Sequence, residues 1–241
     1  MAQTTAAVGL DEAAHQLVAG NRVLRFIPQD DLRALVRRGT VLTLEPRETV
    51  FEQGDEGRTV LVVLQGYLKM SSTTQGGREA ILDIAGPGAV FGEIAALNGW
   101  PRAAGAVALS PVRLLSIEGL SFTQTLLRTP EALLAMVRLV SDRLRTATEQ
   151  MTDAVDLPAP TRVAKALVYL AALHSRAEVG GLRIEFQLSQ RELGGLTGLT
   201  RESINKHLAS FRDAGWIRMS GQDIVLRNLA ALRQDLDIRE F

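Results

Sequence analysis

The chain has 241 residues, of which 46 % are hydrophobic and 22 % charged, the composition of a folded protein with one large domain or two ordinary ones. It contains no cysteine, which excludes disulfides, thiolate zinc sites, cysteine-ligated iron–sulfur clusters and cysteine nucleophiles. The formal net charge is zero, but residues 1–157 carry 15 basic and 18 acidic residues (net −3), whereas residues 158–241 carry 12 and 9 (net +3). A polyanion is therefore expected to meet the second part of the chain.

The first residues carry little regular pattern. Residues 1–20 are rich in Ala, Thr and Gln without a strong period, which predicts a loose tail or a marginal helix. They lack the layout of a secretory signal, and the chain has no run of about 18 apolar residues, so we expect a cytoplasmic protein without membrane contact. Residues 28–38 predict a short helix, because acids occupy its first turn and arginines its last.

From about residue 40 to 118 the pattern is strand-like, with short β-rich runs separated by the glycine-bearing turns QGDEG, QGG and GPG. The predicted strands are Val41–Leu44, Val60–Leu64, Tyr67–Met70, Ala80–Ile84, Ala106–Leu109 and Val112–Ile117. Several short strands at this spacing are typical of a compact antiparallel sandwich or roll.

The pattern changes to a long helix at Pro130. Apolar or small residues recur at spacings of four and three, as in a heptad seam: Leu133, Val137, Val140, Leu144, Ala147 and Met151. Such a helix can pack on the sandwich or pair with a second copy, and the regular seam favours a parallel homodimer through residues 130–152. The segment DLPAP, residues 156–160, ends the helix and predicts a hinge between domains.

Beyond the hinge, residues 161–174 predict a helix and residues 182–186 a strand. Ser189 and Thr200 are each placed to cap a helix, and Glu192 completes a capping box with Ser189. Between these helices TGLT offers Gly198 for a tight turn, so the segment predicts a helix-turn-helix. The following GWIRMSGQDIVL predicts a hairpin turning at Ser220–Gly221, the wing of a winged helix.

The second helix of this unit has two distinct faces. Ile204, Leu208 and Phe211 form an inward stripe, which leaves four polar side chains outward near its start: Arg201, Glu202, Asn205 and Lys206. Arg, Glu and Lys are side chains that read base edges in the major groove, so this face is a candidate DNA-reading surface. The alternative is an ordinary solvated helix face.

The stretch FGEIAALNGWPRAA places one acid, Glu93, and one base, Arg102, in a small or apolar surrounding. A short helix starting near Gly92 together with the Arg102 fork suits an anion, and Glu93 could accept from neighbouring hydroxyls, as in a nucleotide with its ribose. The alternative is an internal ion pair between Glu93 and Arg102.

The run GPGAVFGEIAALNGWPRAAGAV resembles the phosphate-binding cassette of cyclic-nucleotide-binding domains. The order of β-roll, long helix and winged helix-turn-helix is similar to the catabolite-activator family of the bacterial cyclic AMP receptor protein, over about residues 22–226. The resemblance implies an α+β fold with a tail (1–21), a β-roll (22–129), a dimerisation helix with hinge (130–157) and a winged helix-turn-helix (158–241).

The resemblance also implies site residues. Gly92 and Glu93, followed by Ile94, would bind the ribose. Arg102 and Ala103 would bind the cyclic phosphate, and Thr148 would contact the base. Ala147 does not match the hydroxyl residue that family members carry at its position. The implied DNA-binding residues are Ser189, Gln190, Thr200, Arg201, Glu202, Asn205 and Lys206.

The implied effector is cAMP, with cGMP as an alternative. The implied partners are a TGTGA-like palindrome in double-stranded DNA, a second copy of the chain and RNA polymerase. No metal or haem is expected, because His15, His174 and His207 lie outside the roll strands.

The sequence carries no Walker loop, dinucleotide fingerprint, nucleophile elbow or metal-spaced histidine pair, so an enzyme is not expected. Two alternatives to a nucleotide-controlled regulator stay open: a DNA-binding regulator with another effector or none, and a nucleotide-binding module that acts on a protein partner.

Overall fold

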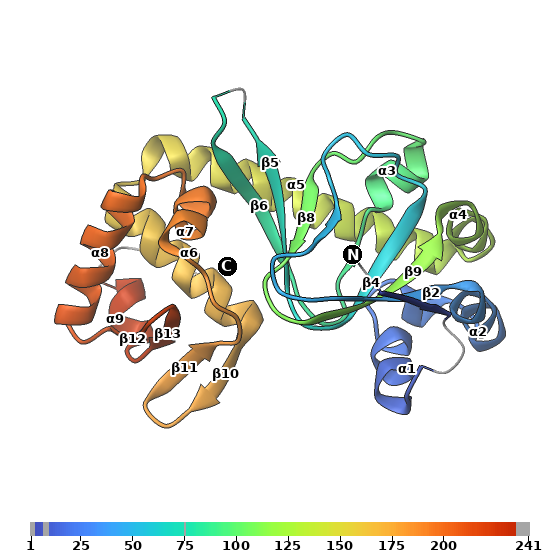
Figure 1. The fold of residues 1–241 in the computed structure, drawn as a ribbon, viewed down its shortest axis with the longest axis horizontal. Helices are drawn as coiled ribbons and strands as arrows, with labels where there is room; N and C mark the ends of the chain where they lie inside the picture. Colours follow the sequence, from blue (N-terminus) through green and yellow to red (C-terminus); the bar gives the residue numbers. More distant parts are fainter. Residues whose placement is uncertain (1–2, 7–9, 75, 235–241) are drawn as a thin grey trace. The chain divides into compact units, whose positions relative to one another are not determined.

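The computed structural model describes residues 3–6, 10–74 and 76–234, which fall into two compact units (Figure 1). The first unit comprises residues up to Ser72 together with Leu82–Arg145, and the second comprises Thr73–Ile81 together with the chain from Thr146 onward. Among the described helices, none has the length and apolar character that a membrane crossing requires.

Two antiparallel sheets form the roll, with strand orders β1-β2-β9-β4-β7 and β3-β8-β5-β6. The strands are β1 (Gln3–Ala6), β2 (Thr40–Leu44), β3 (Thr49–Phe51), β4 (Thr59–Gln65), β5 (Leu68–Thr73), β6 (Glu79–Ala85), β7 (Val90–Phe91), β8 (Gly105–Ala108) and β9 (Val112–Glu118). Each of the six predicted strands is present, which confirms the antiparallel roll. The short strands β3 and β7 carry too few residues to show a period and were not predicted from the sequence.

Strand β4, which lies between β9 and β7, is buried on both faces. Leu61 and Val63 pack in a cluster that joins the two sheets, including Leu114 of β9. Val60 and Val62 point to the opposite face and pack with helices α1 (Glu12–Ala19), α2 (Gln29–Arg38) and α4 (Gly119–Arg128). A strand buried on both faces reads as a continuous apolar run, which TVLVVLQ shows.

A helix near the chain start packs on this core. For residues 1–20 the sequence predicts a loose tail or a marginal helix. The structure has helix α1 over Glu12–Ala19, whereas Gln3–Ala6 form strand β1, paired with β2, where the sequence predicts no strand. Asp11 caps it, accepting from the Ala14 N–H at 2.8 Å, and Ala14 and Val18 are buried against the roll. The helix is short, but tertiary packing stabilises it. The predicted helix 28–38 is confirmed as α2.

The long helix α5 runs from Pro130 to Asp156. In its first turns Ala132, Ala135 and Met136 are buried against the roll. The seam side chains are exposed on the single chain: Leu133, Val137, Val140, Leu144, Ala147 and Met151. Within the described residues, the helix therefore packs on the roll with one face and carries an apolar face that is largely exposed.

The second unit is built around helix α6 (Ala159–His174), whose Val163, Leu167 and Leu170 are fully buried. A four-stranded antiparallel sheet of order β10-β11-β13-β12 accompanies it. Its strands are β10 (Ser175–Glu178), β11 (Gly181–Ile184), β12 (Ile217–Ser220) and β13 (Asp223–Leu226). The remaining helices are α7 (Gln190–Thr197), α8 (Arg201–Asp213) and α9 (Leu229–Gln234). The predicted wing hairpin is confirmed, with its turn one residue later, at residues 221–222.

Two contacts within this unit join the last turns of α5 to α6, across the proline-containing segment predicted as a hinge. Lys165 Nζ lies 2.6 Å from an oxygen of Asp153. Arg162 Nη1 donates to the carbonyl of Thr197 at the end of α7 at 3.2 Å, and lies 3.5 Å from the carbonyl of Ala154. The end of α5, the start of α6 and the end of α7 are thus connected.

Candidate functional site

The cassette stretch forms a tight corner between β7 and the short helix α3 (Glu93–Asn98). Gly92 caps the helix with a φ of 80°, in the left-handed region that side chains disfavour. A Cβ at Gly92 would collide with the guanidinium of Arg102 and lie 3.1 Å from the carbonyl oxygen of Thr59. Glycine is therefore needed here both for its backbone angle and for the close approach of Arg102.

Arg102 is 5 % exposed and its guanidinium is held by neutral groups. Nη1 donates to the carbonyl of Gly92 at 3.0 Å and Nη2 to the hydroxyl of Thr59 at 2.9 Å. The guanidinium also lies over the ring of Phe51, 4.3 Å from its centroid, and Nε is buried without an acceptor among the described residues. Burial lowers the pKa of Arg102, an effect that the charges of Asp55 and Glu93 oppose. The charge of Arg102 is thus incompletely compensated.

Glu93 is 1 % exposed and is paired with an arginine that the sequence reasoning missed. Arg143 of α5 donates from Nη1 to Glu93 Oε1 at 2.6 Å and from Nη2 to the carbonyl of Val90 at 2.7 Å. The alternative of a direct ion pair between Glu93 and Arg102 is therefore wrong. Arg143 stands 50 positions from Glu93, directly before seam residue Leu144, and only the packing of α5 on the roll brings the two together.

A second carboxylate approaches the same arginine. Asp83 of β6 lies with Oδ2 4.0 Å from Nε of Arg143, and its Oδ1 accepts from the Ile84 N–H at 2.8 Å. Although 32 % of the side chain is exposed, surrounding protein atoms remove much of the hydration of the carboxyl group. This desolvation raises the pKa of Asp83, Arg143 partly counters it, and the charge of Glu93 adds to it.

The predicted ligand residues are partly brought together. Gly92 and Arg102 are in contact, Glu93 is next in the chain, and Ile94 and Ala103 are both exposed beside them. Thr148 lies on the part of α5 that belongs to the second unit, and its predicted role stays a prediction.

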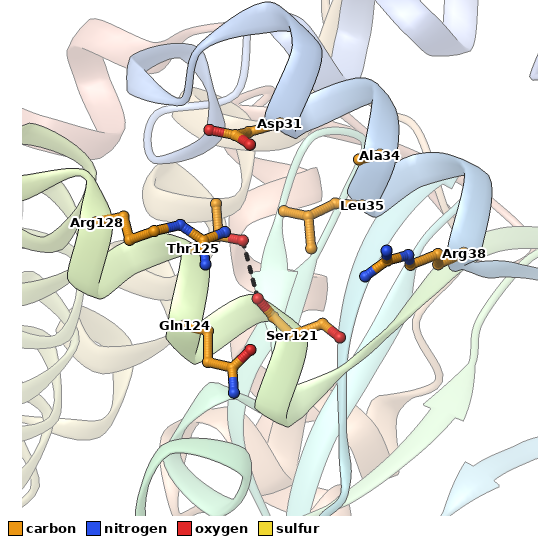
Figure 2. A pocket seen from close by; sticks show the side chains of 8 residues that line it. All are labelled: Asp31, Ala34, Leu35, Arg38, Ser121, Gln124, Thr125 and Arg128. Carbon is orange, nitrogen blue, oxygen red and sulfur yellow. Dashed lines mark hydrogen bonds between the residues drawn. The ribbon is translucent and has the colours of Figure 1, made fainter.

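A separate pocket lies between α2 and α4 (Figure 2). Its lining residues are Asp31, Ala34, Leu35, Arg38, Ser121, Gln124, Thr125 and Arg128. The Thr125 hydroxyl donates to the Ser121 carbonyl, the interaction drawn in Figure 2. None of the residues predicted to bind nucleotide or DNA lines this pocket, so it is not part of either candidate site.

In the second unit, the helix-turn-helix is formed as predicted. Ser189 Oγ accepts from the Glu192 N–H at 3.2 Å while Glu192 accepts from the Ser189 N–H at 2.8 Å, which confirms the capping box. Thr200 Oγ1 accepts from the Ser203 N–H at 3.2 Å and caps α8. Gly198 ends α7 with a φ of 69°, the left-handed conformation expected of a glycine that turns the chain between two helices.

The two faces of α8 are also as predicted. Ile204, Leu208 and Phe211 are buried, and Phe211 packs with Trp216 at a centroid distance of 5.5 Å. The outward set is exposed: Arg201, Glu202, Asn205 and Lys206. Of the other predicted DNA-binding residues, Thr200 is exposed, whereas Ser189 and Gln190 are half-buried. The polar set therefore lies on the first two turns of a helix whose opposite side is anchored in the core.

Two family models match the chain, and they match separate parts of it. The cyclic nucleotide-binding domain matches residues 41–129, which hold most of the roll, Glu93 and Arg102. The Crp-like helix-turn-helix domain matches residues 161–235, which hold α6 to α9.

Three relatives each cover more than three quarters of this chain. A cyclic AMP receptor protein of Thermus thermophilus is 31 % identical over 77 % of this chain and 82 % of its own length. A protein of Mycobacterium tuberculosis named a CRP-like cAMP-activated global transcriptional regulator is 29 % identical over 88 % of this chain and 94 % of its own. The solved structure of a CRP-family transcriptional regulator of Thermus thermophilus matches with a TM-score of 0.69 and 26 % identity, over 81 % of this chain and 96 % of that one. The chain therefore belongs to the cyclic AMP receptor protein family of DNA-binding transcription regulators, and not to an enzyme family.

Proposed function

We propose that the protein is a homodimeric transcription regulator whose specific DNA binding is controlled by a cyclic nucleotide, with cAMP as the effector. The observation that carries this proposal is the buried guanidinium of Arg102, whose hydrogen bonds within the described residues go to neutral acceptors beside the buried acid Glu93. A cyclic phosphate would compensate the charge of Arg102 with charge-assisted hydrogen bonds. The ribose hydroxyl would donate to the oxygen of Glu93 that Arg143 does not use.

Calorimetric titration of the full chain with cAMP, and separately with cGMP, tests the effector. Arg102→Lys keeps the charge but loses the fork, and should weaken cAMP binding roughly 10- to 100-fold, the equivalent of about 1.5–3 kcal/mol for hydrogen bonds to a charged group. Arg37→Lys, an exposed arginine on α2, is the matched control and should bind as the wild type does. Equal affinities for all three proteins would refute the role of Arg102.

The apolar face of α5 supports the homodimer. Val137 is 54 % exposed and Met151 is 73 % exposed, although both lie on a regular heptad seam. A second copy of the same helix would cover them by knobs-into-holes packing. Sedimentation velocity should therefore give a dimer for the wild type and a monomer for Val137→Glu. Arg138→Ala, one position off the seam, should remain dimeric, and a monomeric wild type would refute the proposal.

For DNA we propose that a dimer reads a palindrome with TGTGA-like half-sites about one helical turn apart. Arg201 suits guanine O6 and N7, Glu202 suits cytosine N4, and Lys206 suits guanine or phosphate. Arg201→Ala should reduce discrimination between this site and a scrambled duplex by about 1–3 kcal/mol. Arg212→Ala, at the far end of α8 and paired with Asp213, should leave discrimination unchanged. RNA polymerase is the further partner expected of such a regulator.

One observation favours a second candidate, a regulator that binds DNA without a nucleotide. Glu93 already has a charged partner in Arg143, so its burial does not require a ligand. Fluorescence anisotropy of a labelled TGTGA palindrome and a scrambled duplex, with and without cAMP at one salt concentration, separates the two. Tightening by cAMP supports nucleotide control, whereas equal specific binding in both conditions supports the second candidate.

A further inference from the structure

Three charged side chains meet at the proposed nucleotide site, and two of them, Asp83 and Arg143, lie outside the cassette. Arg143 contacts Glu93 through Nη1 at 2.6 Å, while its Nε edge faces Asp83 at 4.0 Å. Asp83 belongs to β6, an edge strand of the second sheet, whereas Glu93 begins α3. One guanidinium is therefore shared by two carboxylates from different elements.

The two carboxylates are not compensated equally. Glu93 is in close contact with Arg143 and has lost nearly all its exposure, whereas Asp83 receives one backbone hydrogen bond, from Ile84, on its other oxygen. The groups that face Asp83 are Arg143 from α5, Glu93 from α3 and the Ile84 N–H of its own strand. With both acids ionised, the three side chains carry a net charge of −1. Desolvation already raises the pKa of Asp83 in this arrangement.

A bound nucleotide would place its phosphate against Arg102, whose charge otherwise helps to offset that of Glu93, so the negative charge of the two acids would be less compensated. Glu93 is held by Arg143 at 2.6 Å and would accept from the ribose hydroxyls, so the carboxylate left to release the repulsion is Asp83. We propose that Asp83 is a positioning residue of the nucleotide site: when ionised it holds the Nε edge of Arg143, and it takes up a proton when the nucleotide binds. This inference rests on the proposed nucleotide control and adds proton linkage to it.

The direction of the pH effect follows from the charge. The bound anion raises the pKa of Asp83 above its value in the empty site, so nucleotide affinity is highest at pH values below the empty-site pKa. Affinity falls as the pH rises from that pKa to the bound-state pKa, and is constant above it. Each pH unit between the empty-site pKa and the bound-state pKa lowers the nucleotide affinity by up to tenfold.

The test is calorimetric titration of the full chain with cAMP at about pH 5.5 and about pH 8, each in two buffers of different protonation enthalpy. The wild type should take up protons on binding and lose several-fold to tenfold in affinity at the higher pH. Asp83→Asn should bind with little pH dependence and no proton uptake. Asp30→Asn, whose side chain is fully exposed, should behave as the wild type does.

The outcomes separate this inference from the proposed function. Binding of cAMP by the wild type without proton uptake overturns the role of Asp83 and leaves nucleotide control intact, and this measurement needs no variant. Equal proton uptake by Asp83→Asn overturns it as well. No binding of cAMP at either pH refutes the proposed effector and, with it, the proton linkage.

Discussion

Removal of Arg143 should destabilise the roll by about 2–3 kcal/mol, because Glu93 would keep a buried carboxylate without its charged partner. Breaking a buried pair by deleting one member costs about 3–5 kcal/mol when both members are inaccessible. Glu93 meets that condition at 1 % exposure, but 31 % of the Arg143 side chain is exposed, so water would replace part of what Arg143→Met removes. The expected cost, about 2–3 kcal/mol, is therefore at or below the lower end of the range for fully buried pairs.

A double-mutant cycle isolates the pair. Glu93→Gln alone should cost about 1–2 kcal/mol, and the double variant should cost less than the sum of the two by about 1–3 kcal/mol. Urea unfolding is followed by fluorescence of Trp100, which lies in the roll, in a Trp216→Phe background so that the roll alone is reported. A coupling energy below about 0.5 kcal/mol would refute the assignment of Arg143 as the partner that makes burial of Glu93 possible.

Three further predictions follow from single contacts. Gly92→Ala should displace the Arg102 guanidinium and places a side chain at a positive φ, so it should weaken cAMP binding roughly tenfold or more in calorimetry. An unchanged affinity would contradict the close approach of Gly92 and Arg102. Ser189→Ala should cost about 1 kcal/mol in urea unfolding by loss of the cap, and a neutral effect would argue against the capping box. A hydrogen bond from Arg183 holds the pKa of Glu178 below its usual range. The stability that this pair adds to the fold is therefore full at neutral pH and is lost as the pH falls through the lowered pKa. In thermal melts Glu178→Gln should be less sensitive to acid than the wild type, and the two proteins should have the same melting temperature only at low pH.

The parts of the fold that the sequence predicts are those set by local chemistry. The caps at Ser189 and Thr200 each satisfy a backbone N–H three residues away, so a reader of the sequence can place them without knowing the fold. The same holds for the inward stripe of α8, because a helical period reports the buried face directly.

The charge network of the roll could not be predicted in the same way. Arg143 is paired with Glu93 because α5 packs on the roll, and nothing near either residue indicates this partner. Asp83 lies in a short strand, and the residues next to it, Leu82 and Ile84, are apolar and do not indicate a charged partner. Pairings between distant elements depend on tertiary packing, which a local pattern does not contain.

The ties between Asp153 and Lys165 and between Arg162 and Thr197 bear on how a signal could travel through the second unit. The proline-containing segment 156–160 would let α5 and α6 move independently if no contact crossed it, but these contacts restrict that movement. An ion pair spans the proline-containing segment and an arginine of α6 holds the end of α7, so the last turns of α5 are tied through α6 to the first helix of the helix-turn-helix. Thr197 is followed by the turn at Gly198 and by α8, so these contacts end four positions before Arg201, the first residue of the polar reading set.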